Sequence, residues 1–163
     1  MSPAREEHFN GETPSNPSLL GGREYYYMDT KNRVAIPAKI RKDLGSPDYV
    51  YIMPDLHEKC LSLFAPADLE GRMEKLQQKS LTDKRASKAR FALGQNLEKV
   101  VFDGQGRVRI CERLLKFAML EGKNKVVVVG NLHHVQLWSP DLLPEEEPVD
   151  QSALLAICEE ADF

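Results

Sequence analysis

Two short stretches of the chain each hold an Asp and an Arg four residues apart. The first is Asp29 and Arg33 within MDTKNRVAIPAKIR, and the second is Asp103 and Arg107 within FDGQGRVRICERLL. In both stretches three residues separate the pair, and a Val-x-Ile run follows it. A carboxylate at this spacing can accept hydrogen bonds from the guanidinium and fix its direction. The two pairs are therefore the first candidates for a functional group.

The residues inside each pair predict a tight hairpin turn. Asp commonly opens turns because its carboxylate accepts hydrogen bonds from backbone N–H groups just ahead of it. A three-residue hairpin loop often ends at positive φ, where Gly is best and Asn is tolerated. Asn32 and Gly106 occupy that place. The sequence thus predicts the same turn twice, with the arginine across the hairpin from the carboxylate.

Two interpretations of the pairs stand on the residues alone. Each pair could simply staple its hairpin, which is worth roughly 0.2–1 kcal/mol for a partly exposed ion pair. Alternatively, each turn presents an oriented arginine to guanine or to phosphate in a DNA groove. Basic neighbours cluster mainly around the first turn, which favours that copy as the one touching bases. The candidate DNA-contacting residues are Lys31, Arg33, Arg41, Arg107 and Arg109, with Asp29 and Asp103 as orienting carboxylates.

The elements around the two turns repeat in the same order, which indicates a tandem duplication. The first copy predicts strands over 24–28 and 34–36, a helix between Pro37 and Gly45, and strands over 49–53 and 60–64. The second predicts strands over 100–102 and 108–110, a helix over 112–120, and strands over 125–129 and 135–138. LFAP at 63–66 matches LWSP at 137–140 at an offset of 74, which also relates the two aspartates.

The pattern predicts an α+β, mainly β, fold with short helices. The expected divisions are a disordered arm (1–20), a first repeat (21–67), a linker of one or two helices (68–95), a second repeat (96–140) and an acidic tail (141–163). Leu154, Leu155 and Ile157 predict a short amphipathic helix in the tail.

Charge is distributed unevenly along the chain. The whole chain has 22 basic and 25 acidic residues. Residues 1–20 hold one basic and three acidic residues, and residues 141–163 hold no basic and eight acidic residues. Subtraction leaves 21 basic and 14 acidic residues in the middle, a net charge of +7. A basic body is compatible with nucleic acid. The three cysteines, odd in number, and the lack of a long apolar run favour a cytoplasmic protein without a membrane segment.

Other chemistry-bearing residues give a weaker signal. His57, Cys60, His133 and His134 fall in two predicted hairpins, and loop histidines are a better interpretation than a zinc site. No Gly-rich phosphate loop follows a strand, and no G-x-S-x-G motif is present. We therefore expect no enzyme activity, no cofactor and no small-molecule substrate.

MDTKNRVAIPAKIRKDL, CLSLF, FDGQGRVRI and the ending GNLHHVQLW together resemble the MraZ family, bacterial transcriptional regulators of the division and cell-wall gene cluster. The resemblance covers about residues 21–140. It implies two SpoVT/AbrB-type swapped-hairpin halves, intertwined as a double-split β-barrel-like pseudo-dimer. It also implies binding of double-stranded DNA at repeated promoter elements, with Arg33 and Arg107 as contacts, and assembly of a homo-oligomer, a ring.

Two other functions remain open at this point. An AbrB-like antitoxin or transition-state regulator would share the fold and use a tail to bind a toxin, although such chains usually carry one repeat. A ring-forming scaffold without specific DNA recognition would show no salt-dependent DNA affinity. The regulator is the preferred hypothesis, and it implies a cytoplasmic, nucleoid-associated protein.

Overall fold

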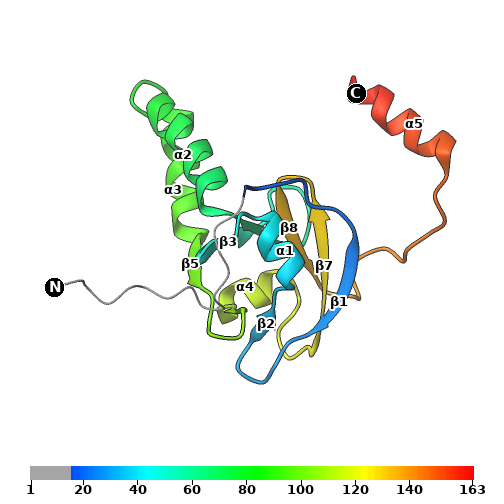
Figure 1. Ribbon diagram of the computed structural model, residues 1–163. Coiled ribbons are helices and arrows are strands. Elements are labelled where there is room, and N and C mark those ends of the chain that lie inside the picture. The colour runs from blue at the N-terminus through cyan, green and yellow to red at the C-terminus, as the bar shows by residue number, and fades with distance from the viewer. Residues whose placement is uncertain (1–15) are drawn as a thin grey trace.

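The computed structural model describes residues 16–163 (Figure 1). The strands are β1 (Arg23–Tyr27), β2 (Arg33–Ala35), β3 (Tyr49–Pro54), β4 (Leu61–Phe64), β5 (Glu98–Val101), β6 (Arg107–Arg109), β7 (Lys125–Asn131) and β8 (His134–Trp138). The helices are α1 (Ala38–Asp43), α2 (Pro66–Ser80), α3 (Lys84–Asn96), α4 (Glu112–Phe117) and α5 (Gln151–Glu160). This mixture of antiparallel sheets and short helices is the predicted α+β class.

The two copies exchange strands with each other. A six-stranded antiparallel sheet has the order β1-β7-β8-β4-β3-β5. Strand β1 of the first copy pairs with β7 of the second, and β5 of the second copy pairs with β3 of the first. Strands β4 and β8 pair at the centre, so the order reads the same after the copies are interchanged. Each copy therefore completes the sheet of the other.

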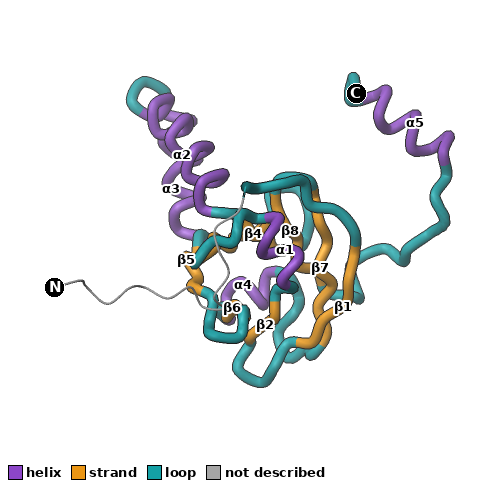
Figure 2. Tube along the Cα trace, in the orientation of Figure 1, coloured by secondary structure: helices purple, strands orange, loops and turns teal. Residues whose placement is uncertain are grey.

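A separate two-stranded ribbon, β2–β6, carries the repeated turns (Figure 2). Val34 pairs with Val108 at its middle, and neither side chain is exposed to solvent. Ile36 and Ile110, which follow the two strands, are buried in the same core. Since side chains alternate along a strand, burial of the valines fixes the residues on either side of them to the outer face.

The linker between the copies forms two helices, α2 and α3, that pack on each other and project from the sheet (Figure 1). Their base rests on Met53 of β3 through Leu69 and Leu93. The tail forms the predicted helix α5, which stands apart from the body (Figure 1). Along residues 16–163, no helix combines the length and apolar character required to cross a bilayer.

The predicted disordered arm lies mostly outside the described residues. Its last part differs from expectation, because the Ser18 N–H donates to the Asp43 carbonyl at 2.9 Å and Leu20 is buried beside Leu132. The prediction of disorder rested on the content of Pro, Ser and Asn. It did not take into account the apolar side chain of Leu20, which packs in the core. Residues 18–20 are thus bound to the body ahead of β1.

Candidate nucleic-acid interface

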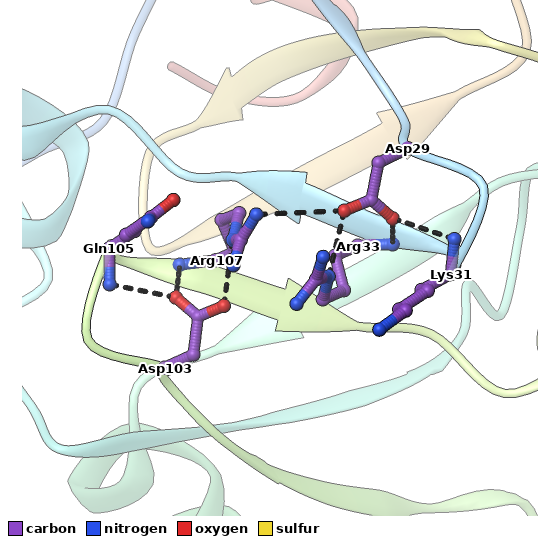
Figure 3. Close-up of polar contacts among 6 residues, drawn as sticks. All are labelled: Asp29, Lys31, Arg33, Asp103, Gln105 and Arg107. Atoms are coloured by element: carbon purple, nitrogen blue, oxygen red, sulfur yellow. Dashed lines mark hydrogen bonds and ion pairs between the residues drawn. The ribbon is translucent and has the colours of Figure 1, made fainter.

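The first turn is held by the carboxylate of Asp29 (Figure 3). Its Oδ1 accepts hydrogen bonds from the backbone N–H groups of Lys31 and Arg33, each at 2.9 Å. Its Oδ2 accepts a hydrogen bond from Arg33 Nε at 2.7 Å. Asn32 has φ 61°, the positive value expected for this loop position. One carboxylate therefore fixes both the backbone of the turn and the direction of the guanidinium.

The second turn repeats this arrangement with different residues between the pair. Asp103 Oδ1 accepts from the N–H groups of Gln105 and Arg107 at 2.9 Å, and its Oδ2 accepts from Arg107 Nε at 2.7 Å. Gly106 has φ 73°. The predicted turn geometry is thus confirmed in both copies. Because the same contacts form with Thr-Lys-Asn and with Gly-Gln-Gly, the Asp and Arg define the turn.

Both oriented arginines lie on the outer face of the ribbon and are partly exposed. The side chain of Arg33 is 29% exposed and that of Arg107 is 25% exposed. Arg107 Nη1 lies 3.6 Å from Asp29 Oδ2, the carboxylate of the other turn (Figure 3). An ion pair also links the two copies across the ribbon. Both side chains are therefore partly accessible to solvent, and their guanidinium groups are restricted in direction.

Like charges meet across the ribbon. The antiparallel register places Arg33 directly opposite Arg109, on the outer face. Like charges at directly opposite positions of a β-ladder are destabilising. Hairpin stapling explains the pairing of each Arg with its Asp, but it does not explain a further arginine at position 109. A surface that binds a polyanion does explain it.

The cations are concentrated at one end of the ribbon. At the offset of 74, Lys31 corresponds to Gln105 and Ala35 corresponds to Arg109. Because the strands are antiparallel, Arg109 lies at the end formed by the first turn, opposite Arg33, and Arg33 is two positions from Lys31 in the chain. Three cations therefore gather at that end, whereas Arg107 is opposite an alanine.

Arg41 does not lie on this face, which corrects its expected place among the DNA-contacting residues. Its side chain is buried, with 8% exposure, and its Nε donates to the Ile36 carbonyl at 2.9 Å. A Cβ built on Gly106 would lie 2.7 Å from Arg41 Cζ. The guanidinium thus packs against the inner side of the second turn. Its role is to support that turn, because a buried guanidinium offers no surface to a duplex.

Hydrogen bonding lowers the pKa of both turn carboxylates. For Asp29 the main cause is the backbone N–H of Arg33, which holds its pKa below the ordinary 3.8. Partial burial raises the pKa of Asp103, but the N–H groups of Arg107 and Gln105 outweigh it, and the net shift is downward. Both groups are therefore ionised at neutral pH, and both ion pairs persist there.

The histidines noted in the sequence lie in the β3–β4 and β7–β8 hairpins. His134 stacks on Phe64 with ring centroids 4.8 Å apart, and its Nε2 lies 3.8 Å from Asp55 Oδ2. Ser62 Oγ donates to the same Asp55 oxygen at 2.7 Å. Within residues 16–163 no group of three or more His, Cys, Asp or Glu side chains is arranged to hold a metal ion.

Several known transcriptional regulators are similar to most of this chain. The transcriptional regulator MraZ of Clostridium acetobutylicum is 30% identical over 137 residues, which cover 82% of this chain and 92% of that protein. MraZ of Shewanella oneidensis is 35% identical over 123 residues, or 74% of this chain and 79% of that protein. MraZ of Leuconostoc mesenteroides is 36% identical over 124 residues, or 76% and 82%.

The chain belongs to the MraZ family of transcriptional regulators. The family resemblance drawn from the two Asp-x-x-x-Arg motifs is therefore confirmed. No family model matches the chain. Membership of a family of regulators also places the protein outside the enzymes, as predicted.

The sequence-based prediction included Arg41 but gave it a DNA-contacting role, whereas the structure buries it beneath the second turn. Arg41 was grouped with its basic neighbours, although the offset of 74 maps it onto Leu115, which is buried in the core. That correspondence marks position 41 as inward-facing. A comparison of the two copies residue by residue was therefore the available signal for its supporting role.

Proposed function

We propose that the protein is a sequence-specific, DNA-binding transcriptional regulator that acts in the cytoplasm at the nucleoid. It binds repeated promoter elements upstream of the division and cell-wall gene cluster. The contacts are Arg33, Arg107, Arg109 and Lys31 on the outer face of β2–β6, with Asp29 and Asp103 as orienting groups. Membership of a family of transcriptional regulators supports this function.

The observation that carries the proposal is the outward pair of arginines, each fixed through Nε by its own aspartate and each partly exposed. An arginine held in this way loses little rotational freedom on binding, so less entropy opposes the contact. Its two Nη groups can address guanine O6 and N7 or grip phosphate. A two-stranded ribbon is narrow enough to enter the major groove of B-DNA.

The exchange of strands between the copies supports the finer description of the fold. We assign residues 21–67 and 96–140 as two SpoVT/AbrB-type swapped-hairpin repeats that form a double-split β-barrel-like pseudo-dimer. Residues 68–95 link them, and residues 141–163 form an acidic tail. A half of this size buries too little apolar surface to be stable alone. Completion of one half by the other supplies the missing core.

The protein also acts as a homo-oligomer, a ring, in this proposal. Each subunit offers one ribbon, and several ribbons on one assembly bind repeated DNA elements more tightly than one could. Binding through several ribbons at once compensates for the small contact surface of each ribbon, which consists of a few cations. It distinguishes the regulator from a single-site binder, because affinity should depend on the number of repeats in the DNA.

A binding titration tests the proposed function. The full chain is mixed with labelled duplexes from upstream of its own gene, with the repeats intact or scrambled, at several salt concentrations. We expect preference for the intact repeats and a log–log salt slope of about −0.9 for each phosphate neutralised. Equal affinity for both duplexes at every salt concentration would contradict sequence-specific regulation and favour a scaffold.

A further inference from the structure

The tail helix α5 has an apolar face without a partner in the described part of the chain. None of its residues is buried, and Leu154 and Ile157 are 54% and 64% exposed. Positions 154, 157 and 158 recur at helical spacing, so they share one face. An isolated helix of 10 residues is marginal in water, even with a good N-cap such as Asp150. Docking of the apolar face would stabilise it.

A groove of complementary character lies at the base of the α2–α3 hairpin. We call it the basal groove; the nonpolar part of its lining is Met53, Leu69, Met73, Leu93, Gly94 and Leu97. It encloses about 170 Å³ and continues into a neighbouring cavity of about 180 Å³ that shares four of these residues. A Cβ at Gly94 would meet nothing within 4 Å, so the groove is open on the α3 side.

The charges around groove and tail are opposite. Helix α3 carries Lys84, Arg85, Lys88 and Arg90 and no acidic residue, and all four are exposed. Residues 145–163 carry seven acidic residues and no basic one. Arg90 lines the basal groove itself, and Arg72 lines the adjoining cavity. An apolar helix flanked by carboxylates therefore fits the groove in both polarity and charge.

The point where the tail leaves the body decides which copy it reaches. Leu142 and Leu143 pack beside Trp138, and the Pro144 carbonyl accepts a hydrogen bond from Arg23 of β1 at 2.7 Å. β1 is one edge of the sheet, whereas the groove lies by β3 and β5 at the opposite edge (Figure 1). Strands β1 and β3 are four spacings apart, about 19 Å.

The linker between Pro144 and α5 has six residues, which span about 20 Å when fully extended. Reaching its own groove would require the linker to run back across the sheet, away from the direction in which the tail leaves the body (Figure 1). A groove on an adjacent subunit makes no such demand. Because donor and acceptor surfaces lie at opposite edges, each copy can give its tail to the next, and such head-to-tail contacts close into rings or extend as filaments.

We propose that α5 of one copy docks through Leu154, Ile157 and Cys158 into the basal groove of a second copy. This inference deepens the proposed self-association and rests on it, but it does not require DNA. The tail is then the connector between subunits, and its acidic residues meet the basic surface of α3 on the neighbour.

Self-association of the full chain provides the first test, by sedimentation velocity or light scattering. The double variant Leu154→Asp/Ile157→Asp changes exposed positions only, so the body should fold as before. Pro148→Asp/Val149→Asp is the control, since it adds the same two negative charges to the tail at exposed positions outside α5. We expect about tenfold weaker association, or more, for the double variant alone. Unchanged association of the double variant would overturn the proposal.

Disulfide trapping then locates the contact. Gln77 also lines the basal groove. One chain keeps Cys158 and the native Gln77, and a differently tagged chain carries Gln77→Cys and Cys158→Ser. Both chains carry Cys111→Ser, and Cys60 is buried. Mixed under mild oxidation, they should form a disulfide between the two tags. Glu121→Cys in place of Gln77→Cys is the control and should not react. A third chain carries both Gln77→Cys and Cys158; a disulfide that forms within this chain, with none between the two tags, would overturn docking between copies.

The outcomes separate this inference from the proposed function. A native chain that stays monomeric would contradict the proposed oligomer as well. A native oligomer that survives the tail variants and forms no trapped disulfide would contradict the tail docking alone. Tighter DNA binding by the double variant, with unchanged association, would show that the tail covers the DNA-binding face instead, and would also overturn the proposal.

Discussion

Arg33 lies directly opposite Arg109 in the β2–β6 ribbon, so two cationic side chains leave the same place on the outer face. The first copy has Ala35 where the second has Arg109, so this opposition occurs once and at one end. A surface arranged in this way is less stable than its neutral counterpart and is more attractive to a polyanion. The two effects can be measured separately.

Replacement of Arg109 should move stability and DNA affinity in opposite directions. Arg109→Ala removes the like charge opposite Arg33 and is expected to leave the free energy of unfolding unchanged or raise it by roughly 0.2–1 kcal/mol. DNA affinity should fall. Urea denaturation and a binding titration measure the two quantities. Ala35→Arg is the matched control, because it creates the opposition to Arg107 and should lower stability. Equal DNA affinity of Arg109→Ala and the native chain would remove position 109 from the interface.

Arg33→Ala should weaken binding of a repeat-bearing duplex by roughly 1–3 kcal/mol, the range for an arginine bidentate to guanine. The melting temperature should change little, because the ion pair with Asp29 is partly exposed. Arg107→Ala should have a smaller effect on affinity, since fewer cations surround it. Lys75→Ala on α2 removes an exposed cation elsewhere and serves as the control. A large fall in stability with native DNA affinity would return the pair to a purely structural role.

Asp29→Asn tests whether orientation of the arginine matters more than net charge. The substitution removes a negative charge, so simple electrostatics would tighten DNA binding. We expect weaker binding instead, because Arg33 loses the carboxylate that fixes its Nε. Glu74→Gln on α2 removes the same charge far from the ribbon. If both variants bind DNA more tightly, the orienting role of Asp29 is wrong.

The same carboxylate gives a pH dependence with a definite sign. The pKa of Asp29 is lower in the folded protein than the ordinary 3.8. A group with a depressed folded pKa contributes stability above its unfolded pKa and loses that contribution as pH falls through the folded pKa. Acid titration of stability should therefore be shallower below pH 3.8 for Asp29→Asn than for the native chain, as followed by urea denaturation at each pH.

The support of the second turn by Arg41 predicts a coupled pair of substitutions. Gly106→Asn gives the second turn the residue of the first, but its Cβ would lie within 2.7 Å of Arg41 Cζ. We expect a loss of stability of about 1–3 kcal/mol, as for overpacked sites. Arg41→Leu supplies the residue found at the equivalent Leu115 and should recover part of that loss in the double variant. Additive effects in the double-mutant cycle would contradict the contact.

His134 should make the protein less stable in mild acid. Burial lowers its pKa below 6.5, against the opposing influence of Asp55. The folded state therefore binds fewer protons than the unfolded state between the folded pKa and 6.5, and stability falls as pH drops through that window. His134→Gln should flatten this dependence in melting curves measured from pH 7.5 to 5. His57→Gln, at an exposed loop position, should keep the native profile.

The order of the elements could be predicted because the local signals agree with each other. Pro37 and Gly45 bracket α1, and Asn32 and Gly106 adopt the positive φ that their turns require. Partner choice between strands could not be derived in this way. The residue pattern of β1 is compatible with pairing to any neighbouring strand. Its actual partner, β7, lies about 100 residues away in the chain.

The two Asp–Arg pairs of the candidate site could be predicted from the sequence, but the positions of Arg109 and Arg41 could not. Asp29 and Asp103 act within four residues of their arginines, so spacing alone placed them. Arg109 belongs to the end formed by the first turn only through the antiparallel register of β2 and β6. Arg41 was misplaced because the space for its guanidinium is created by Gly106, 65 positions later.

The strand exchange has a consequence for synthesis on the ribosome. Arg23 of β1 pairs with Val129 of β7, 106 positions later. At about 5–20 residues per second, the first strand waits roughly 5–20 s for its partner to be translated. During that interval the aromatic β1 is an unpaired edge that a second nascent chain on the same messenger could occupy. Co-translational protection of this N-terminal segment would therefore decide how much of the protein reaches its native topology.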